Sequence, residues 1–173
     1  TNHKVFGDDI AILAGDALLT HAFNLVALSG RENKLSSEYF HDLILAVTRG
    51  AGTEGMIGGQ VADICSDKGR WKKMKKASGV LDFIHENKTA ALIQASLIVG
   101  SLLAKENRLK INALQSYGKN IGMAFQIQDD ILDEIGDKKK LGKKGSDKEN
   151  QKLTYATFYG LAQSKIMAKK HID

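Results

Sequence analysis

The chain has 173 residues, of which 43% are hydrophobic and 26% charged, enough for one domain with a sizeable core but not for two. Charged or strongly polar residues interrupt every apolar stretch, so we expect no segment that spans a membrane. A net charge of +5 suggests nucleic acid as a partner, but the first basic cluster contains a single aromatic residue, Trp71, so we expect no nucleic-acid binding. The single cysteine, Cys65, excludes an intramolecular disulfide framework and is typical of a reducing compartment, which predicts a cytoplasmic protein.

The absence of proline and the helical spacing of the apolar residues predict an all-α fold, with one helical domain over residues 1–173. In chain order, helices are expected over about residues 4–29, 37–65, 78–105, 109–134 and 154–170. The second half of the 37–65 helix is rich in glycine, and each interior glycine costs about 0.5–1 kcal/mol relative to alanine. Close approach of another helix or of a ligand would offset that cost.

The sharpest chemical signal is a cluster of aspartates within the 109–134 helix. Gln126, Asp129, Asp130 and Asp133 fall within an arc of about 100° on one face. Three carboxylates so close together repel one another unless a cation neutralises them. Because oxygen ligands suit a hard ion such as Mg²⁺, the spacing predicts a metal site at Asp129, Asp130 and Asp133. The alternative is a solvated acidic end of the helix.

Three further motifs are weaker signals. Lys88 and Thr89 could hold a phosphate by charge and by a hydroxyl donor, although an ordinary exposed lysine explains the local pattern more often. The lysine-rich loop over 142–152 could cover a polyanion, and it lacks the pattern of a nucleotide P-loop. Gln60 and Asp63 share a helix face and could equally form a buried hydrogen-bonded pair.

Together these motifs resemble the trans-isoprenyl diphosphate synthase (polyprenyl synthetase) family over nearly the whole chain. The motifs occur in the family's order: Gly15-Asp16-Ala17-Leu18-Leu19, Gly58-Gly59-Gln60 with Asp63, Lys88-Thr89-Ala90, Phe125-Gln126 with Asp129-Asp130 and Asp133, and Gly142-Lys143 with Asp147 and Lys152. The resemblance implies the helical bundle of isoprenoid synthases, here without its N-terminal helices.

The resemblance also implies a prenyltransferase that depends on Mg²⁺, with Mn²⁺ as a substitute ion. Such an enzyme condenses isopentenyl diphosphate head-to-tail with an allylic diphosphate, such as dimethylallyl or geranyl diphosphate. The segments Phe83-Ile84-His85 and Lys152-Leu153-Thr154-Tyr155 are similar to those of short-chain members. We therefore expect a farnesyl diphosphate synthase, with a geranylgeranyl diphosphate synthase as the alternative.

The resemblance assigns roles to individual residues. Catalytic roles fall to Lys88, Asp129 and Lys143. The metal ligands are Asp129, Asp130 and, more peripherally, Asp133. Residues that bind the substrate or support its pocket are Lys88, Thr89, Gln126, Lys143, Lys152, Gln60 and Asp63.

The sequence departs from the family at its beginning. The first residue is Thr1, and the family's first aspartate-rich motif and isopentenyl diphosphate site would precede the helix around Gly15. We therefore expect the 173-residue piece to be inactive alone. The alternatives are a non-catalytic subunit or fragment of the same fold, a basic nucleic-acid binder and a terpene cyclase. Family members are usually homodimers, and apolar surfaces on the first and the glycine-rich helix are the expected interface.

Overall fold

The computed structural model describes residues 2–136 and 152–173 of the chain. Within these ranges the chain forms helices and no strand, which confirms the all-α prediction. The elements are α1 (Asn2–Phe6), α2 (Asp8–Glu32), α3 (Ser37–Ala51), α4 (Met56–Ser66), a 3₁₀ turn η1 (Arg70–Lys73), α5 (Ala77–His85), a π-helical turn η2 (Glu86–Ala90), α6 (Ala91–Leu103), α7 (Arg108–Ile135), α9 (Tyr155–Tyr159) and α10 (Leu161–Lys170).

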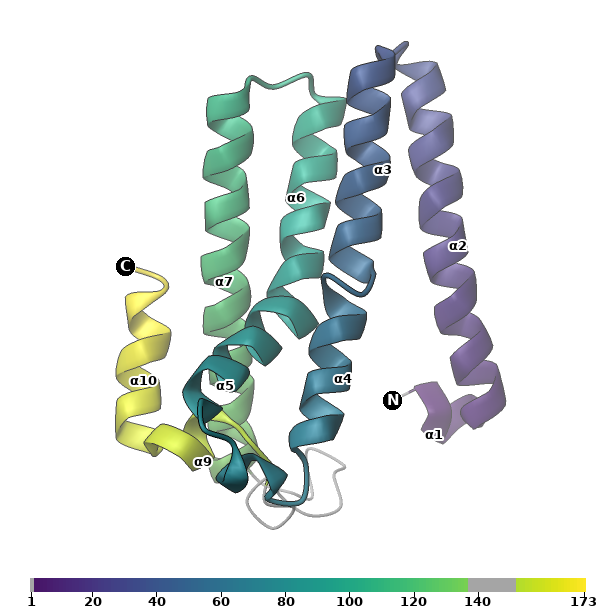
Figure 1. The fold of residues 1–173 in the computed structure, drawn as a ribbon. Helices are drawn as coiled ribbons and strands as arrows, with labels where there is room; N and C mark the ends of the chain where they lie inside the picture. The colour runs from purple at the N-terminus through teal and green to yellow at the C-terminus, as the bar shows by residue number, and fades with distance from the viewer. Residues whose placement is uncertain (1, 137–151) are drawn as a thin grey trace.

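Long helices form a row in which α6 lies between α3 and α7, with α2 at the outer edge (Figure 1). Shorter elements, among them η1, α5 and α9, gather at the lower end of the row, where α4 continues the course of α3. The upper end holds an apolar cluster of Val26, Leu43, Leu102 and Ile111. The lower end holds a second cluster of Leu81, Ile84, Met123, Ile127, Ile131, Leu153, Tyr155 and Ala168.

The expected helix over 37–65 is broken, because α3 ends at Ala51 and α4 begins at Met56. The connection folds back onto the end of α3. A Cβ atom at Gly55 would lie 2.3 Å from the carbonyl oxygen of Arg49 and 2.4 Å from that of Gly50. Only glycine fits so close to two backbone oxygens, so part of the glycine enrichment serves this break.

The expected helix over 78–105 is interrupted by a π-helical turn, η2, which separates α5 from α6. This turn contains Lys88 and Thr89, the two residues predicted to hold a phosphate. A π-helical turn carries one extra residue per turn and changes the face to which side chains point, and such turns are frequent at functional sites.

The long helix α7 lies within one residue of its predicted bounds at each end. Asn107 caps its first turn, since its Oδ1 atom accepts a hydrogen bond from the backbone N–H of Lys110 at 3.0 Å. The helix α9 begins with a capping box in which Thr154 and Thr157 satisfy each other's backbone N–H groups. The first and last expected helices are each divided, at Gly7 and at Gly160.

The helix α2 corrects the expectation that no apolar stretch is long enough to span a membrane. Within the described residues, this one helix of 25 residues contains an 18-residue window with a mean hydropathy of 1.6 and meets the requirements of length and composition. Asp16, His21 and Asn24 do interrupt the stretch, but the apolar residues around them outweigh their effect. A signal sequence near the N-terminus and the mostly buried core helix of a soluble protein pass the same test, and 6% of this window is buried.

Candidate functional site

A cavity of about 180 Å³ lies at the lower end of the bundle, between α4, α5, η2, α7 and the segment before α9. Its walls come from stretches that are far apart in the sequence. The lining residues are Asp63, Ile84, His85, Lys88, Gln126, Asp129, Asp130, Lys152, Leu153 and Thr154. Six of these, namely Asp63, Lys88, Gln126, Asp129, Asp130 and Lys152, are residues that the sequence predicts to be functional.

One buried carboxylate in the cavity contacts two lysines. The Oδ2 atom of Asp63 lies 2.5 Å from Nζ of Lys88 and 3.2 Å from Nζ of Lys152. The Asp63 side chain is 5% exposed, whereas the lysine side chains are 27% and 26% exposed. The two ammonium groups therefore lie side by side at the cavity wall, held by one oxygen atom.

Close contact between α4 and η2 makes this arrangement possible. A Cβ atom at Gly59 would lie 2.2 Å from the backbone nitrogen of Lys88 and 2.7 Å from its Cα atom. Any side chain at position 59 would push the turn away from α4. Glycine at this position thus brings Lys88 within reach of Asp63, one turn further along α4.

Thr89 and Gln126 connect the π-helical turn to α7. The Thr89 hydroxyl donates to Oε1 of Gln126 at 2.6 Å, and Nε2 of Gln126 lies 3.4 Å from Oδ1 of Asp130. Thr89 is half-buried and is not among the residues that line the cavity. Its contact with Gln126 orients an amide that does line the cavity.

Asp130 is the centre of a buried hydrogen-bond network. Its side chain is 4% exposed, and its Oδ2 atom accepts from the backbone N–H of Tyr155 at 2.9 Å and lies 2.9 Å from Nε2 of His85. The other ring nitrogen of His85 lies 3.1 Å from the carbonyl oxygen of Leu81. Asp130 therefore joins α7 to α5 and to the first turn of α9.

The Tyr155 side chain extends this network toward the surface. Its hydroxyl donates to Oδ1 of Asp82 at 2.6 Å, and its ring packs on the His85 ring with centroids 4.8 Å apart. Burial, together with the hydrogen bond to Asp82, raises the pKa of the Tyr155 hydroxyl far above its usual range. Tyr155 is therefore a neutral hydrogen-bond donor at physiological pH.

The three aspartates of the predicted metal site have different surroundings. Asp129 is exposed, whereas Asp130 and Asp133 are buried. Within residues 2–136 and 152–173, no group of three or more His, Cys, Asp or Glu side chains is arranged to hold a metal ion. Asp129 alone offers an exposed carboxylate at the cavity, and one carboxylate with water and phosphate oxygens suffices for Mg²⁺.

Among the described residues that the sequence predicts to be functional, Gln60, Thr89 and Asp133 do not line the cavity. Gln60 is half-buried on α4 and is not among the lining residues. Lys143 lies outside the described residues.

Sequence reasoning missed the roles of His85 and Tyr155. Both residues lie in segments whose only predicted meaning was a similarity to short-chain members of the family. No spacing rule links positions 85, 130 and 155. The one available signal is that His85 precedes Lys88 by three residues and Tyr155 follows Lys152 by three.

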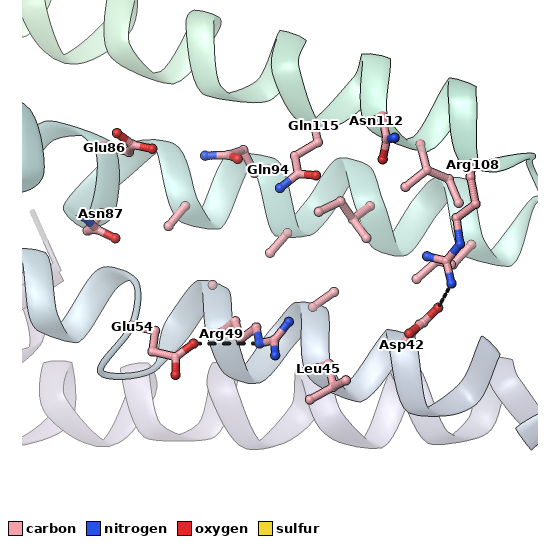
Figure 2. A pocket seen from close by; sticks show the side chains of 17 residues that line it. Asp42, Leu45, Arg49, Glu54, Glu86, Asn87, Gln94, Arg108, Asn112 and Gln115 are labelled. Atoms are coloured by element: carbon pink, nitrogen blue, oxygen red, sulfur yellow. Dashed lines mark hydrogen bonds and ion pairs between the residues drawn. The ribbon is translucent and has the colours of Figure 1, made fainter. Parts of the chain in front are cut away.

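A larger cavity of about 400 Å³ lies between α3, α6 and α7 (Figure 2). Two ion pairs contribute to its walls, Arg108 with Asp42 at 2.7 Å and Arg49 with Glu54 at 3.7 Å. None of the residues predicted from the sequence to be functional lines this cavity.

Comparison with known families assigns the chain to a family. The family model described as polyprenyl synthetase matches residues 1–173. The chain belongs to the polyprenyl synthetase family.

Two relatives illustrate the similarity. The chain is 42% identical over 173 residues to a farnesyl diphosphate synthase of Bacillus subtilis, a match covering 99% of this chain and 56% of that protein. It is 41% identical over 165 residues to a geranylgeranyl diphosphate synthase of Cyanophora paradoxa, covering 95% of this chain and 53% of that protein. The chain thus spans about half the length of the curated relatives it matches.

A solved structure gives the same result. A geranyltransferase of Helicobacter pylori, crystallised with magnesium and isoprenyl diphosphate, superposes with a TM-score of 0.77 at 31% identity. The match covers 99% of this chain and 54% of that one. The helical arrangement described above is therefore that of a polyprenyl synthetase.

Proposed function

We propose that this chain is the part of a short-chain prenyltransferase that binds the diphosphate of the allylic substrate. The observation that carries the proposal is the convergence of Lys88, Lys152 and Asp129 on one cavity from three separate segments. The reaction condenses isopentenyl diphosphate with dimethylallyl or geranyl diphosphate. In that reaction the C–O bond to the allylic diphosphate breaks, the double bond of isopentenyl diphosphate attacks the allylic carbon, and a proton is lost.

The charges at the cavity support a role for a divalent cation. Among the described lining residues, the carboxylates of Asp63, Asp129 and Asp130 outnumber the ammonium groups of Lys88 and Lys152. A diphosphate therefore binds only weakly through the protein charges alone, and a cation between itself and Asp129 would strengthen its binding. The proposed ion is Mg²⁺, with Mn²⁺ as a substitute, and when bound it neutralises charge on the diphosphate.

The three aspartates then have separate roles. Asp129 is the proposed ligand that faces the cavity, and Asp133 is a peripheral member of the same motif. Asp130, although it belongs to the motif, has both carboxylate oxygens within hydrogen-bonding distance of protein donors. We therefore assign Asp130 mainly to fixing the helix against α5 and α9.

The lysines stabilise the leaving group. Lys88 and Lys152 line the cavity that we propose for the diphosphate, where their ammonium groups would stabilise the charge that develops as the C–O bond breaks. Lys143 joins them on the strength of the family motif. Gln126 is oriented by Thr89 and lines the same cavity, so the pair supports the diphosphate rather than taking part in proton transfer.

The proposed product is farnesyl diphosphate, and geranylgeranyl diphosphate is the alternative. Relatives of nearly equal identity carry both names. Chromatography of the dephosphorylated products, C15 or C20, distinguishes the two.

The exposed apolar side chains of α2 suggest a homodimer. Ile12, Leu13 and Leu18 are among its exposed large side chains, which lie around the helix, and only 6% of its apolar window is buried. We propose that α2 packs against a second copy of the chain. We also propose a cytoplasmic protein, consistent with the single Cys65. Sedimentation equilibrium measures the association, and a strictly monomeric chain at micromolar concentration would contradict it.

The decisive experiment separates binding from turnover. The 173-residue chain is titrated with inorganic pyrophosphate and Mg²⁺ in a calorimeter, and is assayed for prenyl transfer with isopentenyl and geranyl diphosphates. We expect pyrophosphate binding that Lys88→Ala weakens by at least tenfold, and no turnover by this chain alone. The control Lys165→Ala, at an exposed lysine on α10, leaves binding unchanged. Wild-type chain that does not bind pyrophosphate would contradict the proposal.

A further inference from the structure

The cluster of Lys88, Asp63 and Lys152 holds two cations on one carboxylate oxygen. Both lysine nitrogens contact Oδ2 of Asp63, and this carboxylate belongs to a side chain that is almost fully buried. The lysines come from η2 and from the segment before α9. Asp63 therefore links two lysines from segments that are far apart in the sequence.

A phosphate oxygen and a carboxylate oxygen compete for the same N–H donors. Each ammonium group has three N–H bonds, and charge-assisted hydrogen bonds to an anion are the strongest that it makes. Asp63 supplies such a partner when no other anion is bound. An incoming diphosphate must take over part of this interaction, and the negative charge of Asp63 then repels the ligand at short range.

We propose that Asp63 is a built-in counter-ion, a positioning residue that keeps Lys88 and Lys152 in place and exchanges with the diphosphate when it binds. This inference rests on the proposed function. Asp63 lowers the affinity of the cavity for free diphosphate while keeping the lysines ordered, which favours release of the product diphosphate. This role predicts that removing the carboxylate charge of Asp63 strengthens the binding of an anion, instead of weakening it.

The test uses Asp63→Asn in the 173-residue chain, which keeps the shape of the side chain and removes its charge. Calorimetric titration with inorganic pyrophosphate is carried out without metal and again with Mg²⁺. We expect binding about tenfold tighter than in the wild-type chain without metal, with a steeper dependence on salt concentration. A carboxylate that acts merely by holding the fold together would give weaker binding on removal, so the sign distinguishes the two roles.

Two further variants keep the result interpretable. Asp42→Asn removes a carboxylate that pairs with Arg108 in the other cavity, and it leaves pyrophosphate binding unchanged. Lys152→Gln weakens binding, and Asp63→Asn has a smaller effect in that background than in the wild-type chain, because one of the two competing contacts is gone.

If Asp63→Asn fails to fold, as judged by circular dichroism, the carboxyl ¹³C resonance of Asp63 in the wild-type chain is followed instead, and it shifts as pyrophosphate is added.

The outcomes separate this inference from the function on which it rests. The counter-ion role of Asp63 is overturned if Asp63→Asn binds pyrophosphate as tightly as or more weakly than the wild-type chain does. It is also overturned if the Asp63 resonance does not shift at saturating pyrophosphate. The proposed function survives both results as long as the wild-type chain binds pyrophosphate. A wild-type chain that binds no pyrophosphate, with or without Mg²⁺, overturns both proposals.

Discussion

The two ends of the bundle are built on different principles. At the upper end, straight helices pack through aliphatic side chains such as Leu43 and Leu102, which are fully buried. At the lower end, a π-helical turn and the segment that caps a short helix border a cavity with buried polar groups. Apolar packing fills the core of the first region, where the ion pair of Arg108 with Asp42 is exposed, whereas in the second region the buried polar groups must find partners.

This difference teaches where chemistry can be placed in a helical protein. Regular helices direct backbone groups only to each other, so the polar groups of the cavity between α3, α6 and α7 come from side chains such as Asp42 and Arg108. The π-helical turn η2 interrupts the helix at the lower end, and its residue Lys88 lines the cavity. The irregular helices are therefore part of the proposed site.

The largest expected effect comes from removing the centre of the lower network. Asp130→Ala leaves His85 and the backbone N–H of Tyr155 without their partner, which costs about 3–5 kcal/mol in the free energy of unfolding. Pyrophosphate binding weakens as well, because the segment that contains Lys152 loses its anchor to α7. Urea denaturation and calorimetry measure the two quantities.

The matched variant at the upper end sharpens the comparison. Leu43→Ala removes a fully buried side chain and costs about 2–5 kcal/mol, but it leaves pyrophosphate binding unchanged under conditions where the chain is folded. Equal losses of binding in the two variants would show that the two ends act as one unit.

A smaller effect is expected where α4 and η2 touch. Gly59→Ala places a methyl group against the backbone of Lys88, and we expect a loss of about 1–3 kcal/mol together with weaker pyrophosphate binding. The control is Gly100→Ala on α6, where a Cβ atom meets nothing within 4 Å. This control is expected to stabilise the chain by up to about 1 kcal/mol, because alanine favours a helix. A Gly59→Ala chain as stable as wild type would contradict the close contact.

The smallest effect concerns His171, which contacts Asn120 midway along α7 at 2.8 Å. Burial, and then the nearby Lys170 ammonium group, lower the pKa of His171 from its ordinary value of 6.5. The unfolded chain therefore binds a proton at a higher pH than the folded chain does. Stability is fully present above pH 6.5 and declines as the pH falls from 6.5 through the lowered pKa.

Thermal unfolding between pH 8 and pH 5 measures this dependence. In His171→Gln we expect stability to fall less steeply as the pH is lowered, since glutamine does not titrate. His21→Gln, on the exposed side of α2, is expected to lose stability with falling pH as the wild-type chain does. If the stability of His171→Gln falls with pH as steeply as that of the wild-type chain, groups other than His171 cause the pH dependence.

The sequence alone determined the helical class and the course of α7. The absence of proline and the apolar periodicity are local properties, which is why α7 was predicted nearly to its ends. The order of the motifs was enough to predict the family, which the match over residues 1–173 confirms.

Only the tertiary structure decided how the motif residues divide their roles. Asp129 and Asp130 are neighbours on one helix face, yet Asp130 is covered by α5 and α9 while Asp129 stays exposed. Burial depends on segments distant in the sequence, and no local pattern encodes which of them will lie there. The same holds for the contact of Lys152 with Asp63, since that distance is set by the packing of α4, η2 and α9 around one cavity.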